Sequence, residues 1–134
     1  MYNLFLDDVR QPGSVESYIN NHVLQVLYRN TTWVIVRNYN DFVNTIKERG
    51  LPEIISFDHD LADINYDPET QQESFVYNEK TGYDCAKWLV EYCLENEVAL
   101  PKWTVHSQNP VGKKNIESVL ISYIRIKQAN KKLI

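Results

Sequence analysis

Short apolar runs alternate along this chain with segments of helical period, and this alternation limits the possible folds more than any other feature. Apolar runs rich in β-branched and aromatic residues predict four strands, at 2–6, 33–36, 54–57 and 103–105. A segment with apolar residues at helical spacing follows each run. The resulting order, β-α-β-α-β-α-β-α, predicts an α/β fold with right-handed crossovers and a parallel sheet that helices cover on both faces.

The helix boundaries follow from capping residues and apolar spacing. Ser14 is a suitable N-cap for one helix, whose inward positions are Val15, Tyr18, Ile19, Val23 and Val26. Asn40 or Asp41 is expected to cap the second helix, and the third is expected from Tyr83 to Leu94. The dipeptide Asn109-Pro110 predicts the start of the last helix, because proline suits the first helical position.

A polar interval, residues 62–80, separates the third strand from the third helix. Loops of this length inside a compact domain are usually functional or disordered. We therefore expect a single domain over 1–134, with 62–80 as an inserted polar loop that serves as a lid, and disorder of this segment is the alternative.

Charge and hydropathy exclude several classes of protein. The formal net charge of −4 makes binding along an extended nucleic-acid duplex unexpected. The sequence has no apolar run of the length that a membrane helix needs, and it opens without a basic and apolar leader. We accordingly expect a cytoplasmic protein without a membrane partner.

Polar residues follow three of the predicted strands, at the point where each strand ends. The segments are Asp7-Asp8-Val9-Arg10, Asp58-His59-Asp60 and His106-Ser107-Gln108-Asn109. Ligands of open parallel sheets bind outside the carboxyl ends of the strands. These three segments, although distant in the sequence, are therefore expected to meet at one site.

Carboxylates are prominent among these residues. Asp7, Asp8 and Asp58 would crowd negative charge into a small volume, which is unfavourable unless a proton or a cation offsets it. Oxygen donors favour Mg²⁺ or Mn²⁺ over Zn²⁺. The trio is therefore a predicted metal site, and the alternative is that these acids cap helices or lie in solvated loops.

Two histidines stand beside the carboxylates. His59 follows Asp58 directly, and His106 ends the fourth predicted strand. Two imidazoles in one crevice suggest general acid–base catalysis on a phosphate ester. The alternative for each is a core histidine whose hydrogen bonds are satisfied within the protein.

Donors for an anion are expected at the same edge of the sheet. The last helix would offer free backbone N–H groups at its N-terminus, a suitable place for phosphate. The glycine in its first turn would allow a ligand close to the backbone. The predicted phosphate-binding residues are Arg10, Ser107, Asn109, Gly112 and Lys113.

At these residues the chain resembles a known family. The segments 5–10, 56–61, 81–84 and 105–112, with Asn115-Ile116, are similar to the signature blocks of the cyclic-phosphate-processing receiver-like domains, an offshoot of the response-regulator receivers common in bacteria and phages. The resemblance implies a flavodoxin-like sheet with strand order 2-1-3-4. It also implies that Asp7 and Asp8 bind a divalent metal, that Asp58 stands where a receiver has its phosphoacceptor, and that Ser107 contacts the phosphoryl group.

The chain departs from a receiver in two respects. It ends after the helix that follows the fourth strand, so the fifth receiver strand and its lysine are expected to be missing. The added His59 and His106 favour hydrolysis over storage of a phosphoryl group. The predicted function is a metal-dependent phosphoesterase acting on a cyclic phosphate, either a cyclic nucleotide or a 2′,3′-cyclic RNA end, with Asp58 as metal ligand or as nucleophile. The alternative is a non-catalytic module that binds a phosphorylated ligand or a protein partner.

Overall fold

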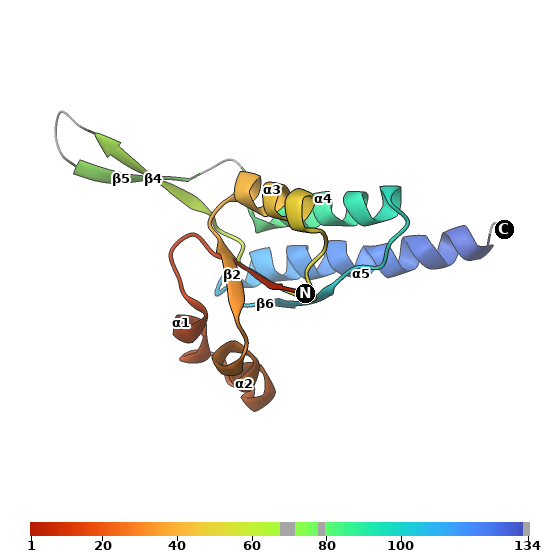
Figure 1. Cartoon of the computed structure of the whole chain (residues 1–134), viewed down its shortest axis with the longest axis horizontal. Coiled ribbons are helices and arrows are strands. Elements are labelled where there is room, and N and C mark those ends of the chain that lie inside the picture. Colours follow the sequence, from red (N-terminus) through yellow and green to blue (C-terminus); the bar gives the residue numbers. More distant parts are fainter. Residues whose placement is uncertain (68–71, 78–79, 133–134) are drawn as a thin grey trace.

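A parallel four-stranded sheet forms the centre of the protein. The computed structural model describes residues 1–67, 72–77 and 80–132. The strands β1 (Asn3–Leu6), β2 (Trp33–Val36), β3 (Ile54–Phe57) and β6 (Lys102–Val105) are ordered β2-β1-β3-β6 (Figure 1). Since β6 is the fourth strand of this sheet, the predicted order 2-1-3-4 is confirmed. Within the described residues no fifth strand joins the sheet, and β6 forms one of its edges.

In the described residues, helices cover the two faces of the sheet, and these are α1 (Pro12–Glu16), α2 (His22–Asn30), α3 (Tyr39–Arg49), α4 (Gly82–Glu95) and α5 (Pro110–Lys132). Alternate residues of β1 show the division. Leu4 and Leu6 join the large core with α3, α4 and α5, whereas Phe5 joins a smaller core with Val15 of α1 and Tyr28 of α2. Helices therefore lie on both faces, as the sequence predicts. No helix among the described residues has both the length and the apolarity to cross a bilayer.

The single helix expected after Ser14 is wrong. The segment forms two helices, α1 and α2, separated by residues 17–21. Asn21 caps α2, since its side-chain oxygen accepts a hydrogen bond from the Leu24 N–H at 3.2 Å. An Asn side chain offers the backbone an alternative to helix continuation, so a new helix starts here. Similarly, Asn38 rather than Asn40 or Asp41 caps α3, by accepting from the Asp41 N–H at 2.8 Å.

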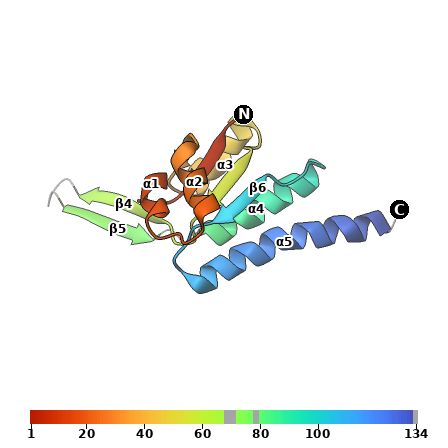
Figure 2. The same ribbon diagram turned by 90° about the horizontal axis from the view of Figure 1, so that it is seen from below.

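The interval expected as a polar loop contains an antiparallel hairpin. Its strands are β4 (Ala62–Asp67) and β5 (Gln72–Tyr77), which pair with each other and with no strand of the main sheet. Figures 1 and 2 show the hairpin extending away from the helices and the sheet. Hydrogen bonding between the two strands replaces the irregular loop that the polar composition suggested.

Candidate functional site

Three strand ends meet around one open cavity of about 560 Å³. Asp8, Val9 and Arg10 line it from the segment after β1, and Asp58 and Asp60 from the segment after β3. The segment after β6 completes the lining with residues 107–110. The predicted convergence at the carboxyl end of the sheet is thus present in the structure.

Asp7, which precedes Asp8 in the segment after β1, is fully buried and is not among the residues that line this cavity. Its Oδ1 accepts hydrogen bonds from the backbone N–H groups of Val9 (3.0 Å) and Arg10 (2.7 Å), and its Oδ2 contacts His106 Nε2 at 2.9 Å. Burial alone would raise the pKa of the Asp7 carboxyl, but the hydrogen bonds from His106 and the two backbone groups outweigh it and lower the pKa to about 2. Asp7 is therefore an ionised carboxylate with a fixed orientation.

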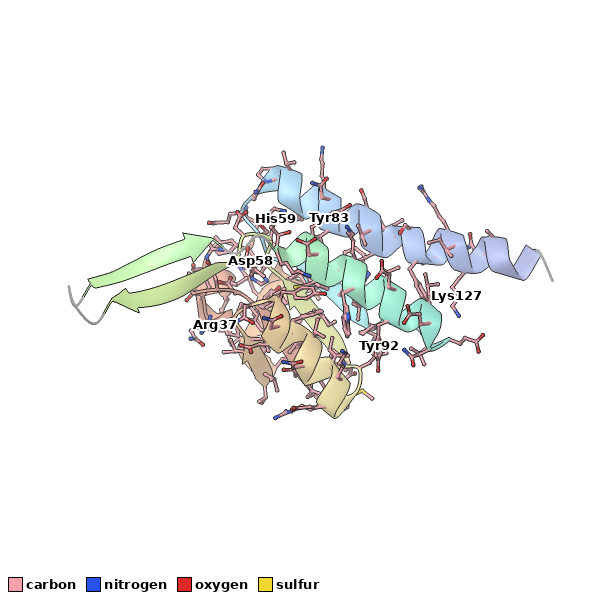
Figure 3. The ribbon with its side chains drawn as sticks, turned by 90° about the horizontal axis from the view of Figure 1, so that it is seen from above. Arg37, Asp58, His59, Tyr83, Tyr92 and Lys127 are labelled. Atoms are coloured by element: carbon pink, nitrogen blue, oxygen red, sulfur yellow. The ribbon has the colours of Figure 1, made fainter. Side chains whose placement is uncertain are left out.

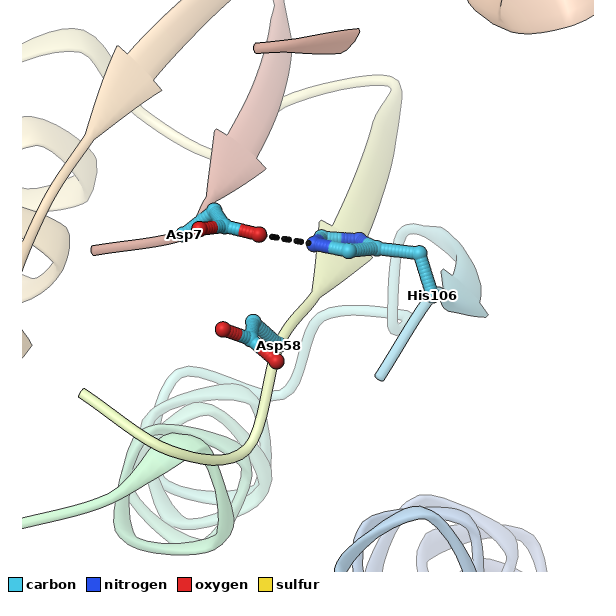
Figure 4. A group of neighbouring side chains, drawn as sticks. All are labelled: Asp7, Asp58 and His106. Atoms are coloured by element: carbon cyan, nitrogen blue, oxygen red, sulfur yellow. Dashed lines mark hydrogen bonds and ion pairs between the residues drawn. The ribbon is translucent and has the colours of Figure 1, made fainter. Parts of the chain in front are cut away.

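Asp58 is the second buried acid of the site. Burial, followed by the charge of Asp7, raises the pKa of the Asp58 carboxyl to about 7. One ligand atom each from Asp7, Asp58 and His106 lie within 4.8 Å of one another (Figure 4). Two buried carboxylates that repel each other, with Asp8 beside them on the cavity wall, are a donor set that suits a hard divalent cation. The residues present therefore fit the predicted Mg²⁺ or Mn²⁺ site.

A buried chain of hydrogen bonds runs from Asp7 into the protein. His106 Nδ1 lies 2.6 Å from Ser56 Oγ, which in turn lies 2.5 Å from the Tyr28 hydroxyl. Burial lowers the pKa of His106, so the imidazole is neutral and carries one proton. Because a carboxylate only accepts, that proton sits on Nε2, and Nδ1 accepts from Ser56. The Ser56 oxygen then accepts from Tyr28, and each proton in the chain has a defined position.

This geometry corrects the role predicted for His106. Both ring nitrogens are bound to protein groups, the ring stacks on Phe5 at 4.5 Å, and only 2% of the residue is exposed. His106 therefore cannot exchange a proton directly with a substrate in the cavity. The order Asp7–His106–Ser56 resembles that of a hydrolase triad, but Ser56 is fully buried and no substrate can reach it. The buried hydrogen bonds from Tyr28 through Ser56 and His106 hold the Asp7 carboxylate in place.

His59 is directed toward the first turn of α5. Its Nδ1 contacts Asp60 Oδ1 at 2.9 Å, and a side chain placed on Gly112 would lie 2.3 Å from His59 Cγ. The prediction that Gly112 admits a ligand is therefore corrected, because the glycine makes room for the His59 ring. Asp60 lines the cavity, whereas His59 is not among the lining residues.

The expected phosphate donors divide into two groups. Arg10 faces the cavity and donates to Gln108 Oε1 at 3.0 Å. Ser107 Oγ accepts from the Asn109 N–H at 3.1 Å, which leaves its hydroxyl proton available as a donor. Asn109 also lines the cavity, while its Oδ1 caps α5 by accepting from the Gly112 N–H at 3.0 Å. Lys113, in contrast, lines a different cavity.

Three residues that support the site were given no role at the sequence level, although Ser56 and Gly82 lie in the segments 56–61 and 81–84 that carry the family resemblance. Arg37, which is labelled in Figure 3, binds the carbonyl oxygens of Asp7 (3.1 Å) and Arg10 (2.6 Å), and so fixes the segment after β1. Its position directly after a strand was the available signal. Ser56 anchors His106. Gly82 begins α4 against the Asp58 backbone, where a side chain would lie 1.8 Å from the carbonyl oxygen, and its place in the segment 81–84 was the available signal.

Comparison with known proteins identifies the family. A profile of the "Cyclic-phosphate processing Receiver domain" matches residues 2–122. Neither the curated proteins nor the solved structures contain a match to the chain. The profile spans all four strands of the sheet and all three strand ends of the cavity. The chain therefore belongs to the cyclic-phosphate processing receiver domain family.

Proposed function

We propose that this protein is a metal-dependent phosphoesterase that opens a cyclic phosphate, either in a cyclic nucleotide or at a 2′,3′-cyclic RNA end. One observation carries the proposal: the same cavity is lined both by carboxylates and by anion donors. Asp8, Asp58 and Asp60 are the carboxylates, and Arg10 and Ser107 are among the donors. A phosphoryl group between a cation and these donors is a suitable occupant.

Asp7, Asp8 and Asp58 would hold Mg²⁺ or Mn²⁺. Such an ion, when bound, polarises a phosphoryl group and makes a water molecule easier to deprotonate. Arg10, oriented by Gln108, and the Ser107 hydroxyl bind the oxygens on which charge develops. The hydrogen-bonded pair His59–Asp60 moves the proton, since Asp60 lines the cavity and His59 Nδ1 contacts its carboxylate.

The burial of His106 gives specific support to a second candidate. Because His106 is buried, the cavity has one accessible histidine fewer than the sequence suggests. Such a site also suits a module that binds a phosphorylated ligand without converting it. Arg10, Ser107 and the bound cation would then serve affinity alone.

Product formation separates the two functions. Nucleoside 2′,3′-cyclic phosphates and an RNA oligonucleotide with a cyclic-phosphate end are incubated with Mg²⁺, with Mn²⁺ or with a chelator, and products are followed by ³¹P NMR. We expect the wild type to form a phosphate monoester only when the metal ion is present. His59→Ala should lower turnover by roughly 10²–10⁴-fold, and Asp58→Asn should abolish turnover. Asp41→Asn, an exposed acid on α3, is the matched control. Saturable binding without product in the wild type favours the binding module.

A further inference from the structure

A second cavity, of about 510 Å³, adjoins the candidate site. The two cavities share Ser107 and Gln108 as lining residues, so they lie on either side of the segment after β6. A ligand whose phosphate contacts Ser107 in the first cavity can therefore extend past this segment into the second.

The break between α1 and α2 forms one wall of this second cavity. Four consecutive residues of that break, 18–21, are among its lining residues. The break has a fixed conformation: the Tyr18 hydroxyl donates to the His106 carbonyl at 2.7 Å, and Gln25 Nε2 donates to the Ile19 carbonyl at 2.5 Å. Had the predicted single helix formed, these residues would have followed a different path.

The lining combines apolar surface with amide groups. Ile19, Leu24 and Val105 supply the apolar surface. Asn20, Asn21 and Gln108 supply amide groups, whose NH₂ groups can donate. The Asn20 oxygen can also accept, whereas Gln108 Oε1 already accepts from Arg10. In the described part of the chain, the Asn20 side chain makes no hydrogen bond, and the Asn21 oxygen is used as a cap while its NH₂ group is not. Lys113 adds one positive charge.

These features match a nucleoside. A nucleobase has apolar faces that need apolar neighbours and an edge of donors and acceptors that amide side chains can read. The phosphate of the same molecule would reach the shared residue Ser107. A base-free cyclic phosphate would leave the apolar surface and the unpaired amides without a ligand.

We propose that the second cavity binds the nucleoside part of the substrate, so that the protein prefers nucleoside cyclic phosphates over base-free cyclic phosphates. This inference rests on the proposed phosphoesterase function for its catalytic readout.

The test compares kcat/KM for a nucleoside 2′,3′-cyclic phosphate with kcat/KM for ethylene glycol cyclic phosphate. Leu24→Trp, which fills the cavity, should lower the ratio of the two constants by about tenfold or more, and Asn20→Ala by roughly 3–10-fold through one lost hydrogen bond. Asn44→Ala, an exposed position on α3, is the matched control and should keep the wild-type ratio. A wild type without preference for the nucleoside substrate, or an unchanged ratio in both variants, overturns the inference while the phosphoesterase function stands.

A second measurement does not need turnover. Adenosine is titrated into the protein and followed by NMR chemical shifts, which should move at residues 18–24 and 105–108 in the wild type and much less in Leu24→Trp. If no cyclic phosphate of either kind is converted, the phosphoesterase function fails, and this titration alone decides on the nucleoside site. Shifts that are absent, or equal in Leu24→Trp, contradict it.

Discussion

The two faces of the parallel sheet are packed in different ways. Toward α3, α4 and α5, the buried side chains are almost all apolar, and aromatic residues such as Phe42 and Phe57 contact one another. Toward α1 and α2, the apolar core is small, and the buried chain Tyr28–Ser56–His106–Asp7 occupies the space beside it. The comparison indicates a division of labour, in which the first face supplies stability and the second fixes the geometry of the site.

Phe42→Ala should give the largest change in stability. Phe42 is fully buried and lies against Phe57 and Trp88, so its truncation should lower the free energy of unfolding by about 3–5 kcal/mol. Urea denaturation measures the loss. If the two faces have these separate roles, folded Phe42→Ala should bind Mg²⁺ with the same affinity as the wild type. A weakened metal site in this variant would break the distinction between the faces.

Asp58→Asn should stabilise the metal-free protein at pH 8 by about 2–4 kcal/mol. The folded-state pKa of about 7 lies above the ordinary 3.8, so the folded protein holds this proton more tightly than the unfolded chain does. Below pH 4 the Asp58 side chain therefore does not lower the free energy of unfolding. As the pH rises from 4 to 7, its ionisation destabilises the protein increasingly, and the effect levels off above pH 7. Denaturation of variant and wild type from pH 4 to pH 8 measures this trend. A constant difference over that range would contradict it.

The same variant should lose the stabilisation that a divalent ion gives. Binding to the folded state raises the melting temperature of the wild type on addition of Mg²⁺ or Mn²⁺. Asp58→Asn should show a much smaller rise, whereas the control Asp41→Asn should follow the wild type. If no divalent ion changes the melting temperature of the wild type, the predicted metal site is contradicted.

Ser56→Ala should have the smallest effect on stability and a marked effect on the site. It leaves His106 Nδ1 without its donor, which costs about 1–3 kcal/mol. Loss of a partner behind a metal ligand typically weakens metal binding by about 10–100-fold. Tyr28→Phe removes the next bond of the chain and should act in the same direction by a smaller factor. Calorimetric titration with Mn²⁺ measures both, and unchanged affinity in Ser56→Ala would show that the chain does not orient Asp7.

The strands were predictable because buried parallel strands are near-continuous apolar runs. Trp33–Val36 and Ile54–Phe57 match the predicted ranges at both ends. The break between α1 and α2 at residues 17–21 was not predictable, since helical spacing continues across it at Val15, Tyr18, Ile19 and Val23. Only Asn20-Asn21, a pair that favours turns and caps, hinted at the interruption.

The sequence was enough to predict which residues come together at the site, but not how their side chains are oriented. The carboxyl ends of adjacent parallel strands meet, so the approach of Asp7 to Asp58 follows from strand order. The directions of the two histidines do not follow from it. His106 turns inward because Ser56 and Asp7 offer it partners, and His59 turns to α5 because Gly112 leaves space. Both depend on residues far away in the sequence.

The bond between Asp7 and His106 joins residues 99 positions apart in the chain. Loops of such length close slowly, and folds that depend on distant pairings fold more slowly than those built from local ones. We therefore expect the site to assemble late in the folding reaction, once β6 has docked on β3, and a nascent chain cannot form it until the residues around 106 have left the ribosome. Metal binding in a refolding experiment should consequently lag behind the return of helical structure, and it can serve as a probe of the last folding step.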